Sequence, residues 1–269
     1  MKFSLLCAAA LVAALSSPAR ADAPEPVIRD LAPSGTLRVA VALGTSPSAF
    51  RAVRDAATGA PKGVAIDLAT ALATKLGVPM QLVPFATLAA ITDTAATGAW
   101  DVAFLPADVE RARSLDFSTP YYLVEGTFLV RTGAAVRDAA SVDRAGVRVG
   151  SIAGSTTMNA LGRAFKKATL VPFRAEQEVR EAFAAAKVDV VAMGRESLER
   201  IAQAVPGSRL LESESRSAGV GIALPKNRPD GLAYLTRFVE EAKASGSVER
   251  AMETAGVRSG VVAPAASAN

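Results

Sequence analysis

The sequence has 269 residues, among which there is no histidine and a single cysteine, Cys7. Neither a Ser-His-Asp triad nor a Cys-His pair can therefore be assembled, and histidine-based metal sites are excluded as well. The formal net charge of +4 comes from basic residues scattered along the chain, so it does not indicate a nucleic-acid partner. No loop matches the acid-rich calcium-binding pattern, and we expect neither a metal nor a cofactor.

The first 21 residues have the pattern of a cleaved secretory signal peptide. An apolar run extends from Phe3 to Leu15, and Ala19-Arg20-Ala21 has the small-x-small pattern of a leader peptidase site. The run is too short for a membrane anchor, which needs roughly 20 apolar residues. Cys7 lies before most of the run, whereas a lipid-attachment cysteine follows it. We therefore expect a periplasmic protein whose mature chain begins at Asp22.

Strand and helix patterns alternate in the first part of the mature chain. Residues 36–43 alternate in the manner of a buried strand, and residues 66–77 carry leucines at intervals of four before Gly77, as in an amphipathic helix. Further strands are expected at residues 80–85 and 101–105, with a helix at 87–98 between them. This βαβαβ order predicts a parallel sheet.

The alternation is interrupted by an extended stretch at residues 121–131, and a second series then begins. Its strands are expected at residues 147–151, 168–173, 188–193 and 209–213, and its helices at 155–165, 175–187 and 196–205. A second extended passage at 218–226 and helices at 231–246 and 247–256 end the pattern.

Two α/β series joined by two extended passages predict two lobes with a double-stranded hinge. We assign residues 22–122 and 221–259 to lobe 1 and residues 123–220 to lobe 2. Residues 260–269 are small and polar, and we expect them to form a disordered tail.

Six motifs occur in a recognisable order along the mature chain. They are GTLRVAV (35–41), GVAIDLATALATKLGV (63–78), WDVAFLPADVERARSLDFSTPYY (100–122), VRVGSIAGSTT (147–157), KVDVVA (187–192) and VGIALPKN (220–227). In this order they resemble the family 3 extracellular solute-binding proteins, the amino-acid-binding components of bacterial ABC importers. The resemblance implies the type II periplasmic-binding-protein fold. It also implies a protein that captures a small anionic or zwitterionic solute and presents it to an ABC transporter permease in the inner membrane. We expect this protein to be a monomer.

The resemblance assigns a ligand-binding role to Arg111. In the family, the arginine that ends a Thr-x-x-Arg segment holds the ligand's α-carboxylate, and this arginine falls on Arg111. The chain departs from the family here, because Asp108 stands where threonine is usual and the segment after Asp101 is two residues shorter. A guanidinium in a partly desolvated cleft suits a bidentate pair with a carboxylate.

The family's Gly-Thr-Thr turn falls on Gly154, Ser155 and Thr156. The resemblance implies that these hydroxyls, together with the free amides of a helix N-terminus, bind the same carboxylate. The chain has no histidine for a Ser-His-Asp triad, and the resemblance implies that these hydroxyls bind a ligand and do not act as nucleophiles. Ser155 also suits the N-cap of the following helix.

Two further ligand contacts are implied less directly. Phe50 is the aromatic residue available in the loop after the first strand, where family members usually stack a ring on the ligand; packing in the core is the alternative. Family amino-acid binders also carry an aspartate for the ligand's ammonium at the position of Gly194, beside Arg195. If Arg195 faces the cleft, the site suits an organic acid. If it points to solvent, or if Asp108 supplies the missing negative charge, the site suits an amino acid.

Two other functions remain open. Periplasmic cyclohexadienyl and arogenate dehydratases resemble the same family, and Asp108 or Glu125 would then be the general acid or base. A soluble sensor input without a transporter is the other alternative. We expect a binding protein without catalytic residues.

Overall fold

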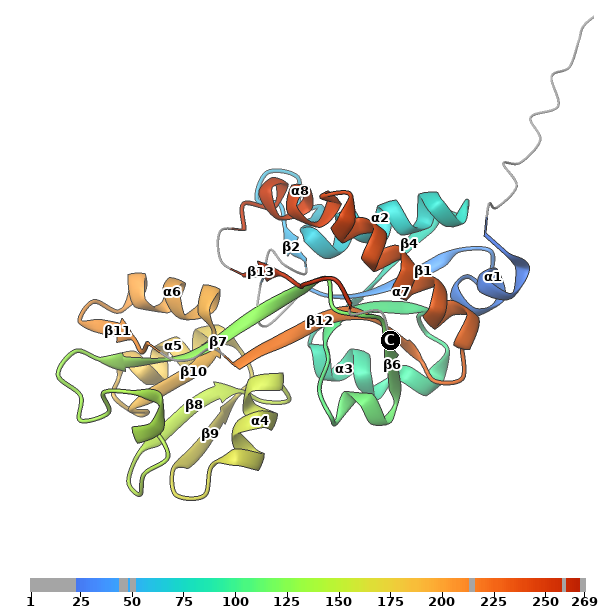
Figure 1. Ribbon diagram of the computed structural model, residues 1–269. Coiled ribbons are helices and arrows are strands. Elements are labelled where there is room, and N and C mark those ends of the chain that lie inside the picture. Colours follow the sequence, from blue (N-terminus) through green and yellow to red (C-terminus); the bar gives the residue numbers. More distant parts are fainter. Residues whose placement is uncertain (1–22, 44–47, 49–51, 213–215, 258–259, 267–269) are drawn as a thin grey trace, which may run out of the picture.

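The computed structural model describes residues 23–43, 48, 52–212, 216–257 and 260–266. Two lobes lie side by side and are joined by two long strands, β7 (Tyr122–Arg131) and β12 (Arg216–Pro225) (Figure 1). The predicted signal peptide at residues 1–21 and the predicted ligand contact Phe50 lie outside the described residues.

Lobe 1 contains the first series of strands and the C-terminal helices. Its sheet has the order β4-β1-β5-β12, in which β4, β1 and β5 are parallel, and Val39 of β1 pairs with both Leu82 and Val102. The principal strands are β1 (Leu37–Ala42), β4 (Met80–Phe85) and β5 (Val102–Pro106), and the short strands are β2 (Val53–Arg54), β3 (Pro61–Lys62) and β6 (Leu115–Phe117). The helices are α1 (Glu25–Leu31), α2 (Val64–Leu76), α3 (Leu88–Asp93), α7 (Pro229–Ala244) and α8 (Ser247–Thr254), with 3₁₀ turns η1 (Ala95–Thr97) and η2 (Arg111–Arg113).

Lobe 2 contains the second series. Its sheet has the order β7-β10-β8-β9, in which β10, β8 and β9 are parallel and β7 is antiparallel to β10. Its strands are β8 (Arg148–Ile152), β9 (Thr169–Phe173), β10 (Val190–Gly194) and β11 (Ser208–Leu210). Its helices are α4 (Thr156–Ala164), α5 (Glu176–Ala184) and α6 (Arg195–Ala204), with the 3₁₀ turn η3 (Ala139–Ser141).

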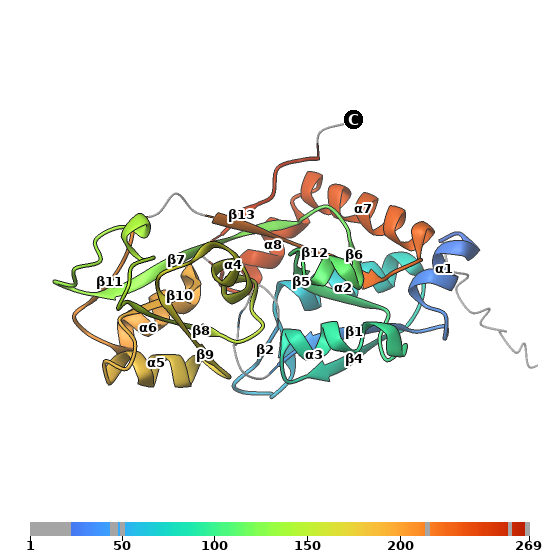
Figure 2. The same cartoon turned by 90° about the horizontal axis from the view of Figure 1, so that it is seen from below.

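The two long strands form the hinge that the sequence predicts. Strand β12 pairs with β5 in lobe 1 through residues 220–223 and with β7 through residues 216–220. Strand β7 continues into lobe 2, where its residues 126–130 pair with β10. Because the two strands hydrogen-bond to each other between the lobes, the lobes share one continuous sheet (Figure 2).

Each lobe buries apolar side chains on both faces of its sheet. In lobe 1, one core packs β1 and β5 against α2, α7 and α8, and a second core around Trp100 and Ile91 packs the opposite face against α3. In lobe 2, Phe183 of α5 and Leu198 of α6 pack against one face of the sheet, and Leu161 of α4 packs against the other face. The sheets are therefore covered on both sides, as the apolar strands predict.

Both lobes contain the same arginine–aspartate pair at the start of their central strands. In lobe 1, Asp101 accepts hydrogen bonds from the backbone and guanidinium of Arg38, including Nη2 at 2.7 Å. In lobe 2, Asp189 accepts the equivalent bonds from Arg148, with Nη2 also at 2.7 Å. In each case the aspartate precedes the parallel neighbouring strand and so fixes its register.

The tail differs from the sequence prediction. Val261–Val262 form β13, which pairs with Leu123 and Tyr122 of β7, and the amide of Ala263 donates to the Tyr121 carbonyl at 3.1 Å. The expectation of disorder is therefore wrong for residues 260–266, because an unpaired edge of the hinge strand accepts them. Helix α1 was not predicted from the sequence either. No helix in the described part of the chain is long and apolar enough to cross a membrane.

Candidate functional site

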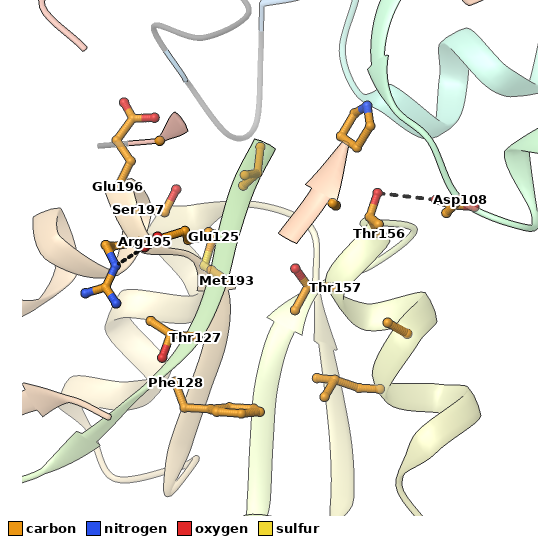
Figure 3. A pocket seen from close by; sticks show the side chains of 18 of the residues that line it. Asp108, Glu125, Thr127, Phe128, Thr156, Thr157, Met193, Arg195, Glu196 and Ser197 are labelled. Atoms are coloured by element: carbon orange, nitrogen blue, oxygen red, sulfur yellow. Dashed lines mark hydrogen bonds and ion pairs between the residues drawn. The ribbon is translucent and has the colours of Figure 1, made fainter. Parts of the chain in front are cut away.

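A cavity of about 570 Å³ lies where the lobes meet. The C-terminal ends of strands from both lobes converge on it, which is where open α/β sheets bind ligands. Figure 3 shows Asp108 on the side of lobe 1 and Thr156, Thr157 and Phe128 on the side of lobe 2. Its volume is that of a typical small-molecule site.

Arg111 and Asp108 form a buried ion pair beside this cavity. Arg111 Nη1 lies 2.5 Å from Asp108 Oδ2, and each side chain is 3% exposed. Asp108 Oδ1 also accepts the backbone amides of Glu110 and Arg111, so it holds the turn that leads into η2, which carries Arg111. The aspartate that departs from the family pattern therefore positions the arginine and neutralises its charge.

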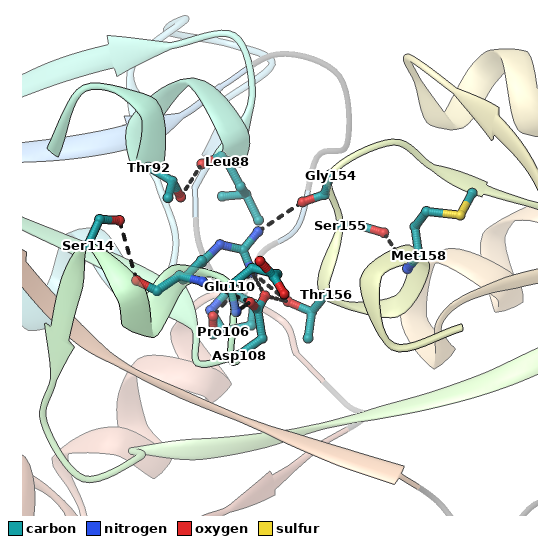
Figure 4. A network of polar contacts seen from close by, with 11 residues as sticks. Leu88, Thr92, Pro106, Asp108, Glu110, Ser114, Gly154, Ser155, Thr156 and Met158 are labelled. Carbon is teal, nitrogen blue, oxygen red and sulfur yellow. Dashed lines mark hydrogen bonds and ion pairs between the residues drawn. The ribbon is translucent and has the colours of Figure 1, made fainter. Parts of the chain in front are cut away.

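The same arginine reaches across to lobe 2. Its Nη1 donates to the Thr156 hydroxyl at 2.6 Å, and its Nη2 donates to the Gly154 carbonyl at 3.1 Å. The Thr156 hydroxyl lies 3.3 Å from Asp108 Oδ2 (Figure 4). The structure thus brings together four of the residues predicted from the sequence, Arg111, Asp108, Gly154 and Thr156. Asp108 and Thr156 line the cavity, whereas Arg111 is not among the lining residues.

The turn before α4 has the geometry of a helix N-terminus. Ser155 is the N-cap, and its hydroxyl accepts the amide of Met158 at 3.1 Å. Gly154 has a φ of +67°, and a Cβ there would lie 3.2 Å from Ala89 of lobe 1, so a larger residue would strain the turn and press on the opposite lobe. Thr156 and Thr157 line the cavity, whereas the Ser155 side chain caps helix α4.

Arg195 also lies on the cavity, but it is paired. Its Nε donates to Glu125 Oε2 at 2.7 Å, and both side chains are about 30% exposed. Arg195 begins helix α6 and Glu125 lies on the hinge strand β7. The positive charge is therefore balanced inside the protein.

Ser48 and Glu196 form a second contact between the lobes. The Ser48 hydroxyl donates to Glu196 Oε2 at 3.0 Å, while Glu196 Oε1 pairs with Arg200 at 2.9 Å. Both residues line the cavity, as does Thr157. The sequence analysis did not select any of these three, and only the position of Thr157, directly after the predicted turn, offered a signal.

Metal binding finds no support in the described residues, where no group of three or more histidine, cysteine, aspartate or glutamate side chains could hold an ion. The described acidic groups of the cavity are engaged by arginines. The arrangement is suited to binding a small charged solute through hydrogen bonds and ion pairs.

A family model of the bacterial extracellular solute-binding proteins, family 3, matches residues 37–255. The L-arginine-binding protein of Pseudomonas aeruginosa is 25% identical over 151 residues, which are 52% of this chain and 58% of that protein. The match therefore spans less than two thirds of that relative's length.

Two solved structures illustrate the structural similarity. An amino acid ABC transporter substrate-binding protein from Streptococcus pneumoniae, bound to L-arginine, has a TM-score of 0.70 at 22% identity, covering 84% of this chain and 96% of its own. An ancestral amino-acid-binding protein, a precursor of cyclohexadienyl dehydratase, has a TM-score of 0.71 at 24% identity, covering 84% and 98%. The two-lobe type II periplasmic-binding-protein fold expected from the sequence is confirmed.

Proposed function

Because the chain belongs to family 3 of the bacterial extracellular solute-binding proteins, we propose that it captures an α-amino acid between its lobes. It would release this ligand to the permease of an ABC importer in the inner membrane, acting as a periplasmic monomer. The relatives named above bind amino acids, and the arginine-binding protein and the arginine-bound structure specify arginine for those proteins.

The observation that carries the proposal is the convergence of two anion-binding elements from opposite lobes. The guanidinium of Arg111 and the N-terminus of α4 meet through Thr156 at 2.6 Å and the Gly154 carbonyl at 3.1 Å. A carboxylate inserted between them would accept hydrogen bonds from Arg111 in lobe 1 and from the first turn of α4 in lobe 2. The direct contacts leave no room for it, so the lobes must first separate.

The charges around the cavity favour an amino acid over an organic acid. Both guanidiniums considered in the sequence analysis are balanced, Arg111 by Asp108 and Arg195 by Glu125. These two guanidiniums therefore offer no surplus positive charge to a second carboxylate of a ligand. Asp108, on the cavity wall beside Arg111, would accept the ligand's ammonium while Arg111 takes its carboxylate.

Ligand binding would favour the closed arrangement, because only there can one carboxylate contact both lobes. Hydrogen bonds join the lobes in this structure, among them those from Arg111 to Thr156 and from Ser48 to Glu196. A bound ligand would replace the first of these contacts and add further contacts between the lobes. Closure around the solute would then present a distinct surface to the permease.

A thermal-shift screen over amino acids and small organic acids tests this function. A ligand at 100 times its dissociation constant should stabilise the protein by about 2.7 kcal/mol. Calorimetry of matched pairs, each an α-amino acid and its 2-oxo or 2-hydroxy counterpart, should then favour the amino acid by about tenfold, or about 1.4 kcal/mol. A preference for the 2-oxo or 2-hydroxy acid would contradict the proposal.

We do not propose an enzyme. Asp108 and Glu125, the acid–base candidates of a dehydratase, are each bound to an arginine. One of the similar structures is described as a precursor of cyclohexadienyl dehydratase, which makes prephenate and arogenate the appropriate substrates to test. Formation of the aromatic product by the purified protein would overturn this part of the proposal.

A further inference from the structure

We propose that the cavity selects an amino acid with an uncharged, apolar side chain, and not a cationic one. This inference rests on the proposed function and concerns the part of the cavity away from Asp108 and Thr156. It separates the chain from the arginine-binding proteins to which it is similar.

The first observation is the apolar wall inside lobe 2. Val124 and Phe128 of β7 line the cavity together with Ala160 and Leu161 of α4 and with Phe165 just after that helix. The rings of Phe128 and Phe165 are stacked, with centroids 6.2 Å apart. Figure 3 shows Phe128 on β7 and Thr157 near the start of α4, both in the part of the pocket formed by lobe 2. An aliphatic or aromatic side chain placed there would be removed from water.

The second observation is that the acidic groups of the cavity already have cationic partners. Among the described residues, the lining carboxylates are Asp108, Glu125 and Glu196. Their distances to Arg111, Arg195 and Arg200 are 2.5, 2.7 and 2.9 Å. The ligand's α-ammonium takes one oxygen of Asp108 in the proposed function, which leaves no carboxylate to neutralise a second cation.

The third observation concerns Arg163, which also lines the cavity. It is exposed, and the described part of the chain places no carboxylate in an ion pair with it. A guanidinium or ammonium on the ligand would meet this positive charge beside an apolar wall. Burying an unpaired cation is costly, whereas an uncharged side chain incurs no such cost.

Two matched ligand pairs test the inference on the mature wild-type protein. L-Norleucine has the side-chain carbons of L-lysine without the ammonium, and L-citrulline is the uncharged analogue of L-arginine. In titration calorimetry we expect each uncharged ligand to bind about tenfold or more tightly than its cationic counterpart. Equal or tighter binding of L-lysine and L-arginine would overturn the inference.

A variant of the cavity wall sharpens the test. Ala160→Glu introduces a carboxylate on the part of the cavity wall formed by α4, and it should shift the lysine-to-norleucine preference toward lysine by about tenfold. Ala164→Glu is the matched control, because Ala164 is the exposed last residue of the same helix and does not line the cavity. An unchanged preference in a folded Ala160→Glu protein would contradict the placement of the ligand side chain along this wall.

The outcomes separate the two proposals. If amino acids bind but the cationic ligands are preferred, only the selectivity is wrong and the proposed function stands. If no α-amino acid binds or stabilises the protein, both proposals fail together.

Discussion

The two lobes use the same arginine–aspartate pair to join parallel strands, but only lobe 1 buries it. Asp101 is 0% exposed and Arg38 is 24% exposed, whereas Arg148 and Asp189 are 43% and 40% exposed. Arg228, which precedes α7, also lies 3.7 Å from Asp101. Arg228 from the C-terminal part of the chain therefore adds a second arginine to the lobe 1 pair, whereas the described residues of lobe 2 leave Arg148 and Asp189 partly exposed.

This difference indicates that the same kind of ion pair can contribute unequally to the stability of the two lobes. An exposed ion pair contributes little because water solvates each charge on its own. A buried aspartate that loses its partner is strongly destabilising, because water cannot replace the lost hydrogen bonds. We therefore expect the two lobes to respond differently to the same substitution.

The largest effect is expected from Asp101→Asn. The free energy of unfolding should fall by about 3 kcal/mol, near the low end for breaking a buried pair, because Arg38 can still reach solvent. This loss corresponds to a decrease in Tm of roughly 6–12 °C, measurable by calorimetry. A loss no larger than that of Asp189→Asn would show that burial does not distinguish the pairs.

The helix caps should behave alike in the two lobes. Thr87 accepts the amide of Ala90 at 3.0 Å in lobe 1, and Ser155 accepts that of Met158 at 3.1 Å in lobe 2. Each change to alanine should cost about 1 kcal/mol, because capping is a local interaction. Urea unfolding of both variants checks this, and a clearly larger loss at Ser155 would indicate a role beyond the cap.

The smallest effect is expected from Asp189→Asn, and it should depend on pH. The hydrogen bond from the Arg148 side chain holds the pKa of Asp189 below its ordinary value. The carboxylate therefore stabilises the fold above pH ~4, the ordinary range of the unfolded residue, and this contribution is lost as the pH falls through the lowered folded pKa. The Tm values of the wild type and of Asp189→Asn should converge as the pH falls through the lowered folded pKa of Asp189. A difference in Tm that stays constant over this fall would contradict the stabilising role of the Asp189 carboxylate.

Much of the fold could be predicted because apolar periodicity is a local property. Helix α2 stops at Gly77, as predicted, although it begins at Val64 and not at Ile66. The structure adds that Gly77 adopts the left-handed conformation. Helix α1 escaped prediction because its seven residues depend on packing Val27 and Leu31 in the lobe 1 core. Strand β13 escaped because its partner, β7, lies far away in the sequence.

The candidate site could be predicted only in part, and through the family resemblance. That resemblance selected Arg111, Asp108 and the turn before α4, which the structure brings into contact. It did not indicate that Glu125 balances Arg195 or that Ser48 reaches Glu196, since these pairs are 70 and 148 positions apart. Such contacts follow from the hinge and from lobe closure, and no local pattern encodes them.

The central claim is that Arg111 of lobe 1 and the α4 N-terminus of lobe 2 hold one ligand carboxylate. Its most direct test is calorimetric titration of Arg111→Ala with the amino acid found in the screen. The double variant Arg111→Ala, Asp108→Asn is the control, because it removes the negative charge that Arg111→Ala leaves without its arginine partner. We expect a folded protein whose affinity is weaker by about 2–5 kcal/mol, or about 30-fold to several thousand-fold. Unchanged affinity in a folded Arg111→Ala protein would contradict the claim and make Arg111 a structural link between the lobes.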